Sequence, residues 1–514
     1  MMPSFPVRRS SREHLVPLAI VVLTAAAARL LVLPFATTDG GDAASRVWSA
    51  WSWLAGPHLI THGVWGPLHT YLIAAALSLR PDPVHAPVAL GVLFSVATPA
   101  VMYAFVQVEF ASRRAALLVA LTYALYPIAI RNGVSVRSET PFAFFLVLAM
   151  LGVAYARRAD GSWRHAAAGG LALTVASMLR YEGWMLTPLI AVLLRHRPRL
   201  LLTFCGCAVI HPIVWMVGNA VHYGDPFYSI SSASRWELES MGRRAISRGA
   251  LVRKATGYPL TILSGMTVLL GAIAVAGAIM AAATRHRVRD WLVPLGGLVG
   301  LWMLAVARGS LVPKLNYTET AGTLLFPFSA VIYEYVGVRR WAPLPLAGLA
   351  VGLAGITALL SCRACLDRVG LGFLAGVPPV PSIENQAIAL QLPPLLTEAL
   401  EQDSPALVSD HYGWGAPRYV ALLTRLPRHR MFLAPGAPGQ QLNGDSLAQF
   451  LTTNPRGVLI AMSGSRFSTA LGISPTAESA QFRGVRIGLE PLRTLPWPGR
   501  KPAELLVFRY HLLR

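Results

Sequence analysis

A succession of long apolar runs dominates this sequence. Most are close to the roughly 20 residues that a helix needs to cross the hydrocarbon core of a bilayer. By that length rule about eleven runs qualify, near residues 15–35, 84–108, 115–131, 140–156, 165–180, 184–195, 200–220, 258–283, 291–307, 319–337 and 341–360. Only 13% of the residues are charged, against about 25% in a soluble chain. The sequence therefore predicts an all-α polytopic membrane domain over 15–360.

The positive charges indicate which loops face the cytoplasm. A formal net charge of +21 would suit a nucleic-acid partner, but the basic residues occur in short clusters between apolar runs, as in membrane loops. The short run 65–79 decides the topology, because counting it as a span would invert every later helix. If it lies along the outer surface, the cytoplasmic loops are all basic. These loops carry Arg113–Arg114, Arg157–Arg158–Arg164, Arg195–Arg197–Arg199, Arg285–Arg287–Arg289 and Arg339–Arg340.

We therefore expect an interfacial helix at 65–79, a cytoplasmic tail at 1–14 and a first outer loop at 36–83. The first apolar run lacks a small-residue cleavage site after it, so we do not expect it to be a removed signal peptide. No nucleic-acid partner is expected. The Ala-, Gly- and Arg-rich composition suits a bacterial inner membrane.

The chain beyond residue 360 has a different character. A Gly/Pro-containing linker at 361–384 precedes segments in which strand-like runs, such as RGVLIAMS and AELLVFRYHLL, alternate with helix-like ones. This alternation predicts a C-terminal soluble α/β domain at 385–514 on the outer side. Within it, the aromatic residues of 409–420 either stack on an acceptor sugar or pack as a loop.

The first outer loop opens with FATTDGGDAASRVWSAWSW, residues 35–53. Its three tryptophans recur at roughly helical spacing and predict an amphipathic helix in the headgroup zone. Asp39, Asp42 and Arg46 precede and accompany them. Ionisable groups at the edge of a membrane are costly and are usually functional, so these three are candidate site residues.

Further acids and bases are expected on the same outer face. Glu139 and Arg137 lie in VRSETPF, and Arg180 and Glu182 lie in RYEG. Together they suit transfer of a group from a lipid phosphate. Arginine matches the phosphate oxygens and stabilises the charge that builds there as the bond breaks. A carboxylate can take the proton of an incoming hydroxyl.

These segments resemble the C-type (GT-C) integral-membrane glycosyltransferases, which include the protein O-mannosyltransferases and the aminoarabinose transferases acting on lipid A. GDAASRVWSAWSWLAG resembles the family's acid-bearing outer loop, and GPLHTYLIAAAL resembles its second, proline-led interfacial helix. RSETP supplies an acid before the fourth span and LRYEGW a basic residue after the fifth. The resemblance implies a GT-C-like fold and a polyprenyl-phosphate sugar donor.

Carried over residue by residue, the resemblance makes Asp42 the catalytic base, with Asp39 as its competitor. Glu139 stands at the second acid position and Arg180 where a phosphate contact is expected. The remaining substrate-binding candidates are Arg46, Arg137, Glu182, Lys314 and Tyr317. The family's metal-binding Glu would fall near Trp65, so no metal site and no cofactor are predicted. One departure is KLNYTETAG, where Asn316 replaces the Arg of an R–Y pair; either Lys314 supplies that charge or the contact is absent.

These residues predict an inverting glycosyltransferase, because a hydroxyl that displaces the lipid phosphate in one step inverts the anomeric centre. The acceptor would be a glycan, a lipid or a protein. The alternative is a multi-span transporter or flippase, a class that places charges near the bilayer midplane on broken helices. Arg29, inside the first apolar run, either extends to the headgroups or touches the donor phosphate.

Overall fold

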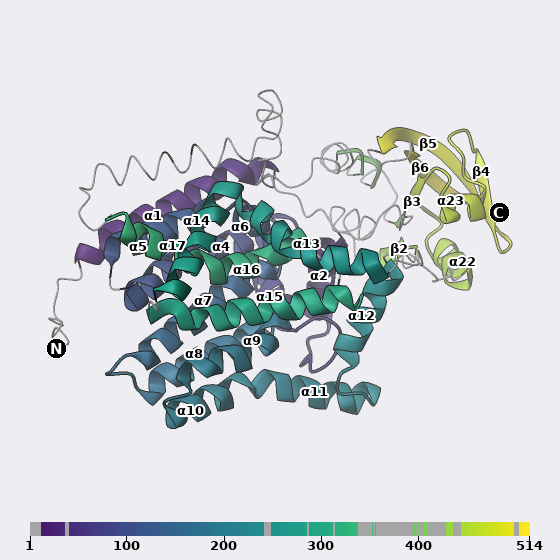
Figure 1. Ribbon diagram of the computed structural model, residues 1–514. Helices are drawn as coiled ribbons and strands as arrows, with labels where there is room; N and C mark the ends of the chain where they lie inside the picture. The colour runs from purple at the N-terminus through teal and green to yellow at the C-terminus, as the bar shows by residue number, and fades with distance from the viewer. Residues whose placement is uncertain are drawn as a thin grey trace. The chain divides into compact units, whose positions relative to one another are not determined.

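Figure 1 shows the protein as a computed structural model. The structure describes residues 12–35, 41–110, 112–240, 248–284, 287–311, 314–337, 352, 355, 392, 394–396, 398–400, 406–409, 428–434, 444–497 and 503–513. It divides into two compact units. The membrane unit comprises Met1–Pro34, His58–His69 and Ala89–Pro379, and the tail unit comprises Phe35–Pro57, Thr70–Val88 and Val380–Arg514.

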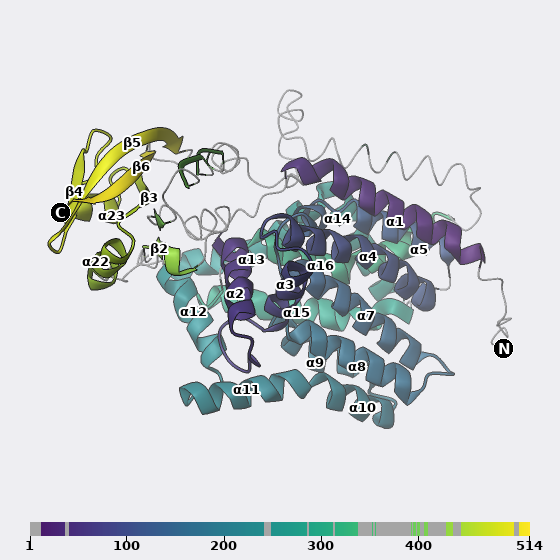
Figure 2. The ribbon, with the colours of Figure 1, turned by 180° about the vertical axis from the view of Figure 1, so that it is seen from behind.

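The membrane unit is built of helices (Figures 1 and 2). Its α-helices are α1 (Arg12–Val32), α4 (His85–Phe110, whose first residues belong to the tail unit), α5 (Arg113–Ala124), α6 (Pro127–Gly133), α7 (Glu139–Arg157), α8 (Trp163–Ser177), α9 (Glu182–Ala191), α10 (Pro198–Ala208), α11 (Ile210–Tyr223), α12 (Tyr228–Ser240), α13 (Arg248–Met266), α14 (Val268–Ala283), α15 (Leu292–Ala307), α16 (Thr318–Leu325) and α17 (Ser329–Tyr335). Short 3-10 turns join several of them, among them η2 (Val192–Leu194), η3 (Arg287–Trp291), η4 (Leu315–Tyr317) and η5 (Phe326–Phe328).

Within the described residues, five helices are long and apolar enough to cross a membrane. They are Leu15–Val32, His85–Glu109, Glu139–Arg157, Pro198–Tyr223 and Val288–Ala307. Two further pairs qualify jointly but are bent, by 57° between α5 and α6 and by 116° between α13 and α14. The protein is thus a multi-pass, mainly helical membrane protein. The run expected at 341–360 and the linker at 361–384 lie outside the described residues, apart from positions 352 and 355.

The apolar run that we expected as one span over 258–283 is broken. Between α13 and α14 stands Thr267, with a φ of 67°. A β-branched residue rarely adopts a positive φ. The axes of α13 and α14 differ by 116° across this residue. Hydropathy could not reveal the turn, because residues on both sides of it are apolar.

The connections between helices divide the membrane unit into two ends. At one end α10 starts beside the end of α7, because Arg197 Nη1 donates to the carbonyl oxygens of Ala156 at 2.8 Å and Arg158 at 2.6 Å. Arg157, at the same end, pairs with Glu109 at 3.2 Å and Asp290 at 2.7 Å. This is the end at which the sequence predicts basic cytoplasmic loops.

The segment 58–69 of the first outer loop lies at the opposite end. Gly63 N donates to Asn219 Oδ1 at 3.2 Å, near the end of α11. Leu68 N donates to the Met178 carbonyl at 3.2 Å, and the Tyr181 hydroxyl donates to the Val64 carbonyl at 2.5 Å. These bonds hold the segment against the turn between α8 and α9, where Arg180 lies.

Arg29 is wholly buried in the membrane unit, so the expectation that it extends to the headgroups is wrong. Its Nε donates to Ser95 Oγ at 2.8 Å, and its Nη1 donates to the carbonyls of Ala25, at 3.3 Å, and Ala124. Ala124 is the last residue of α5, and α6 begins with Pro127, which has no N–H to donate. The guanidinium therefore supplies a donor where the helix is interrupted.

The tail unit contains a six-stranded mixed sheet in the order β2-β1-β3-β6-β5-β4. Its strands are β1 (Leu407–Ser409), β2 (Met431–Leu433), β3 (Arg456–Met462), β4 (Ser479–Phe482), β5 (Val485–Trp497) and β6 (Ala503–Leu513). β1 is parallel to β2 and β3, and the remaining pairs are antiparallel. The strands expected in RGVLIAMS and AELLVFRYHLL are confirmed as β3 and β6. Residues 410–420 of the aromatic segment lie outside the described residues.

Apolar clusters pack on both faces of the sheet around β3 and β6, which explains why these two strands read as nearly continuous apolar runs. One face packs on residues of α22 (Gly444–Thr453) and α23 (Arg466–Leu471). The other face forms what we call the Leu407 cluster. It consists of Leu392, Leu396, Ala399, Leu407, Val458, Ile460, Leu495, Leu505 and Val507.

Two helices from the first outer loop also belong to the tail unit. They are α2 (Gly41–Ala55) and α3 (Leu68–Leu79, which enters this unit at Thr70), and they lie side by side in Figure 2. The ring centroids of Trp53 in α2 and Tyr71 in α3 are 5.2 Å apart. The helix predicted around the tryptophans is thus present as α2. Its Trp48 packs against the Leu407 cluster, so this ring is engaged by protein.

Candidate active site

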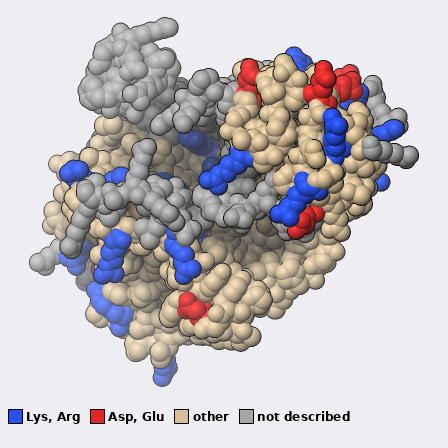
Figure 3. Space-filling model, turned by 90° about the vertical axis from the view of Figure 1, so that its right-hand side faces the viewer, with Lys and Arg blue, Asp and Glu red and all other residues tan. Residues whose placement is uncertain are grey.

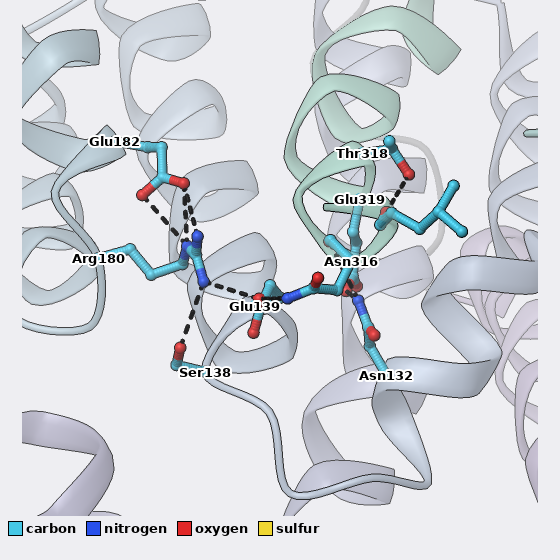
Figure 4. A network of polar contacts seen from close by, with 9 residues as sticks. Asn132, Ser138, Glu139, Arg180, Glu182, Asn316, Thr318 and Glu319 are labelled. Atoms are coloured by element: carbon cyan, nitrogen blue, oxygen red, sulfur yellow. Dashed lines mark hydrogen bonds and ion pairs between the residues drawn. The ribbon is translucent and has the colours of Figure 1, made fainter. Parts of the chain in front are cut away.

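Segments far apart in the sequence bring polar side chains together in the membrane unit (Figure 4). They are the start of α7, the turn between α8 and α9, and η4 with the start of α16; α6 adds Asn132. Glu139 and Glu182 are the first residues of α7 and α9. Negative charge is favourable at this position, because the helix dipole presents its positive end there.

Arg180 lies at the centre of this arrangement. Its Nη1 is 2.8 Å from Glu139 Oε1 and its Nη2 is 2.6 Å from Glu182 Oε1. Its Nε donates to both Glu182 oxygens at 3.2 Å, and Ser138 Oγ lies 3.5 Å from Nη1. The side chain is only 10% exposed. Two carboxylates therefore hold the guanidinium in a forked, charge-assisted arrangement.

The contacts continue from Glu139 towards α16. The side-chain amide of Asn316 donates to Glu139 Oε1. Asn132 Nδ2 donates to Glu319 Oε2 at 2.7 Å and to the Asn316 carbonyl at 3.3 Å. One polar network thus runs from Glu182 to Glu319. Asn316, which stands where the resemblance implies an arginine, is part of this network.

Aromatic side chains border the network. The Arg180 Cζ lies 4.6 Å from the ring centroid of Tyr317, and Lys314 Nζ lies 5.7 Å from the same ring. Tyr258 is wholly buried, and its hydroxyl has no hydrogen-bond partner within the described part of the chain. It lies within electrostatic range of Glu182, Tyr317 and Arg180.

The charges of the network are unequal. Burial alone would lower the pKa of Arg180, but Glu139 and Glu182 act against it and hold that pKa well above its ordinary value. Arg180 is therefore a permanent cation. It faces two carboxylates directly, and Glu319 lies further along the network. A phosphate at Arg180 would therefore compete with Glu139 and Glu182 for the guanidinium.

The structure brings together five of the site residues expected from the sequence, namely Glu139, Arg180, Glu182, Lys314 and Tyr317. Arg137 is half-buried in the link that precedes α7.

The remaining candidates belong to the tail unit. Asp42 and Arg46 lie on α2 in the tail unit, Asp42 in the first turn. Asp39 and the side chain of Asp42 lie outside the described residues.

Asn132, Ser138 and Glu319 were not expected in the site. Asn132 lies in RNGVSVRSET and Glu319 in KLNYTETAG, both segments that the sequence places at the outer face. A search for every polar group at that end of an apolar run would have found them.

Two histidines of the first outer loop pack against protein. The ring of His62 stacks on that of His222 at 3.7 Å, and His69 is buried. In the part of the chain that the structure describes, no three His, Cys, Asp or Glu side chains are grouped as metal ligands.

Comparison with known proteins supports the same fold. The profile of the dolichyl-phosphate-mannose-protein mannosyltransferase family matches residues 62–217. No curated protein sequence matches the chain. The crystal structure of ArnT from Cupriavidus metallidurans bound to undecaprenyl phosphate is similar, with a TM-score of 0.65 and 13% identity over 97% of this chain and 98% of that chain.

The apo structure of the same ArnT gives a TM-score of 0.61 with 12% identity, over 96% of this chain and 98% of that chain. The chain therefore has an ArnT-like GT-C fold with a sheet-containing C-terminal domain. The expected resemblance to the C-type glycosyltransferases is confirmed at the level of the fold, and the family profile points to the same class.

Proposed function

We propose that this protein is a membrane glycosyltransferase that moves a sugar from a polyprenyl phosphate to an acceptor hydroxyl outside the cytoplasm. The similarity of nearly the whole chain to an ArnT whose crystal structure holds undecaprenyl phosphate carries this proposal. The family profile over residues 62–217 supports it independently of the structure.

In the proposed reaction, Asp42 accepts the proton of the acceptor hydroxyl, and Asp39 is the alternative base. The hydroxyl oxygen then attacks the anomeric carbon of the sugar. The bond from that carbon to the phosphate oxygen breaks, and the polyprenyl phosphate leaves with the electron pair. Because bond formation and cleavage occur on opposite faces of one carbon, a single displacement inverts the configuration.

The phosphate needs fixed positive charge during this step. Arg180, which Glu139 and Glu182 also contact, is assigned to the phosphate together with Arg46 or Lys314. Arg180 orients the two acids and joins the phosphate when one acid releases it. Glu139, which Asn316 and Arg180 both contact, positions the acceptor. Arg137, Glu182 and Tyr317 complete the substrate-binding set.

The test uses purified protein in lipid vesicles with radiolabelled undecaprenyl-phosphate sugars. Wild type should transfer label to acceptors in bacterial membrane extract. Asp42→Asn should lose about 10²–10⁴-fold in rate, the usual contribution of a general base, and remain folded. Asp39→Asn should lose much less. Full activity in Asp42→Asn would remove that residue as the base, and no transfer by wild type from any lipid-linked sugar would overturn the proposal.

The alternative function is transport or flipping of a lipid-linked substrate. The turn at Thr267 between α13 and α14 favours it, because transporters use broken helices. The polar network, however, lies at one end of the membrane unit. In the vesicle assay a flippase moves the labelled lipid between leaflets with its sugar still attached. A transferase cleaves the sugar from the lipid.

A further inference from the structure

The tail sheet packs against a helix that comes from the first outer loop. Trp48 of α2 is half-buried and lies against the Leu407 cluster, together with partly buried residues of the strands such as Met431 and Met462. Leu392 is the cluster member closest to Trp48 in the sequence, and it lies 344 positions further along the chain (392 − 48 = 344). The contact is therefore a tertiary one that unites the N-terminal loop with the C-terminal domain.

The rest of α2 is also enclosed. Ala43, Val47 and Ala50 recur at helical spacing on one face, and each is 0% exposed. Trp51 meets Trp48 edge-on at 6.4 Å, and Trp53 meets Tyr71 of α3 at 5.2 Å. A helix that rests on a lipid surface through its aromatic side chains would leave more of these side chains uncovered. The position of α2 is thus determined by protein packing on several sides.

We infer that the C-terminal sheet holds α2 in place, and that Trp48 is the positioning residue through which it does so. The first turn of α2 carries Asp42, six residues and about 9 Å along the axis from Trp48 at 1.5 Å per residue. Trp48 therefore acts on Asp42 through the helix backbone and does not touch the reacting atoms. The catalytic part of this inference rests on the proposed function, whereas the packing part does not.

The packing part is tested by amide hydrogen exchange on the full-length protein in detergent. Trp48→Ala should raise the exchange rate of residues 41–55 by tenfold or more. A tenfold change corresponds to about 1.4 kcal/mol in the free energy of opening. Exchange in α7 should not change. Trp48→Phe keeps an aromatic ring and should restore protection. Trp163→Ala is the matched control, because this tryptophan is 61% exposed on α8 and should leave residues 41–55 unaffected.

Unchanged exchange of residues 41–55 in Trp48→Ala would overturn the inference, whatever the protein is found to catalyse. If Trp48→Ala unfolds the chain, Trp48→Leu gives the same test with a smaller loss of packing. Leu retains apolar contact, so intermediate exchange is expected from it. Exchange equal to wild type in a folded Trp48→Leu would also count against the anchoring role.

The catalytic part is tested with the radiolabelled undecaprenyl-phosphate sugars of the vesicle assay as donors. Trp48→Ala should lower kcat by up to about 100-fold, the cost of a small misplacement of a reacting group, and leave the KM for the donor within twofold. If Trp48 had a purely structural role, Trp48→Ala would instead contain a smaller fraction of active protein. At low temperature its activity would then return to that of wild type. Faster amide exchange of residues 41–55 with an unchanged kcat would refute the catalytic part of the inference and leave the packing part intact. Absence of turnover in wild type would refute the proposed function and leave the exchange result standing.

Discussion

Arg180 is the residue on which the polar network depends. It lies between Glu139 and Glu182 with little exposure of any of the three side chains. Removing one partner of a buried ion pair leaves an uncompensated charge and costs about 3–5 kcal/mol. We therefore expect Arg180→Ala to lower the free energy of unfolding by about that amount, measured by thermal unfolding in detergent. Arg180→Lys should cost less, because it keeps the charge but loses the fork.

Two comparisons separate lost charge pairing from lost packing. Arg158→Ala removes an exposed pair with Asp160, whose side chain is 78% exposed, and should leave the stability close to that of wild type because solvent screens such pairs. A triple variant, Arg180→Met with Glu139→Gln and Glu182→Gln, removes the charges on both sides and should recover much of the loss. If the triple variant is no more stable than Arg180→Ala, the network is not held by its charges.

At this scale the sequence predicts the isolated ionisable residues well. Glu139, Arg180 and Glu182 stand out because each interrupts or borders an apolar run, where a charge is costly. Their pairing with one another is a different matter. Asn132 meets Glu319 across 187 positions of sequence, and only the packing of α6 against α16 determines that contact. An amide carries no charge that would mark it in an apolar sequence.

At the scale of the elements, the first outer loop packs closely on α11 at Gly218. A Cβ added at Gly218 would lie closer than 3.0 Å to the Thr61 carbonyl, which belongs to the backbone and cannot rotate away. Gly218→Ala should therefore push residues 58–63 off α11 and destabilise the protein by about 1–3 kcal/mol, as overpacking does.

Gly206 in α10 is the matched control for Gly218. Nothing lies within 4 Å of a Cβ added there. Gly206→Ala should be neutral or should stabilise the protein by up to about 1 kcal/mol through helix propensity. Thermal unfolding of both variants in the same detergent measures the difference. Equal stability of the two would show that Thr61 does not pack on Gly218.

The break between α5 and α6 depends on a side chain from another helix. Arg29→Met should leave the Ala124 carbonyl without the donor that Arg29 now provides. An unsatisfied buried polar group costs about 1–3 kcal/mol, so thermal unfolding should show a loss of that size. Leu30→Ala is the control, because Leu30 is 58% exposed on the same helix. A loss no larger than that of Leu30→Ala would remove Arg29 from this role.

Helices were the most predictable elements, since bilayer-length apolar runs leave few alternatives. Their bends were not, because the left-handed Thr267 and the Ala124–Pro127 junction alter the direction of the chain without altering its hydropathy. In the tail, β3 and β6 were predictable from apolar runs of β-branched and aromatic residues. β5 carries Arg486, Glu490 and Arg493 among its apolar residues, so the same pattern does not reveal it.

At the scale of the whole molecule, the distribution of positive charge indicates how the protein is oriented in the membrane. The net charge is +21, and Figure 3 shows Lys and Arg side chains scattered over one face, without a single dense patch. In the membrane unit Arg157 and Arg197 gather at one end. The polar network and the segment 58–69 occupy the other. The positive-inside rule assigns the first of these ends to the cytoplasm.

This orientation predicts the reactivity of two introduced cysteines. The continuous pair α10–α11 covers 26 residues, about 39 Å at 1.5 Å per residue, and separates the Arg197 end from the turn after α11. Phe227 lies just beyond that turn and is 56% exposed, and Asp160 lies in the exposed link after α7. In a background lacking the native cysteines, Phe227→Cys should react with a membrane-impermeant maleimide in intact spheroplasts. Asp160→Cys should react only after lysis.

Both cysteines should react in lysed membranes, which controls for burial. The reverse pattern in intact spheroplasts would place the segment 58–69 and the Arg180 network in the cytoplasm. A lipid-linked sugar presented on the outer leaflet could not then reach Glu139 or Lys314, and the proposed reaction would have no route to its donor. Because labelling requires no substrate, it tests the orientation on which the proposed chemistry depends before any sugar has been identified.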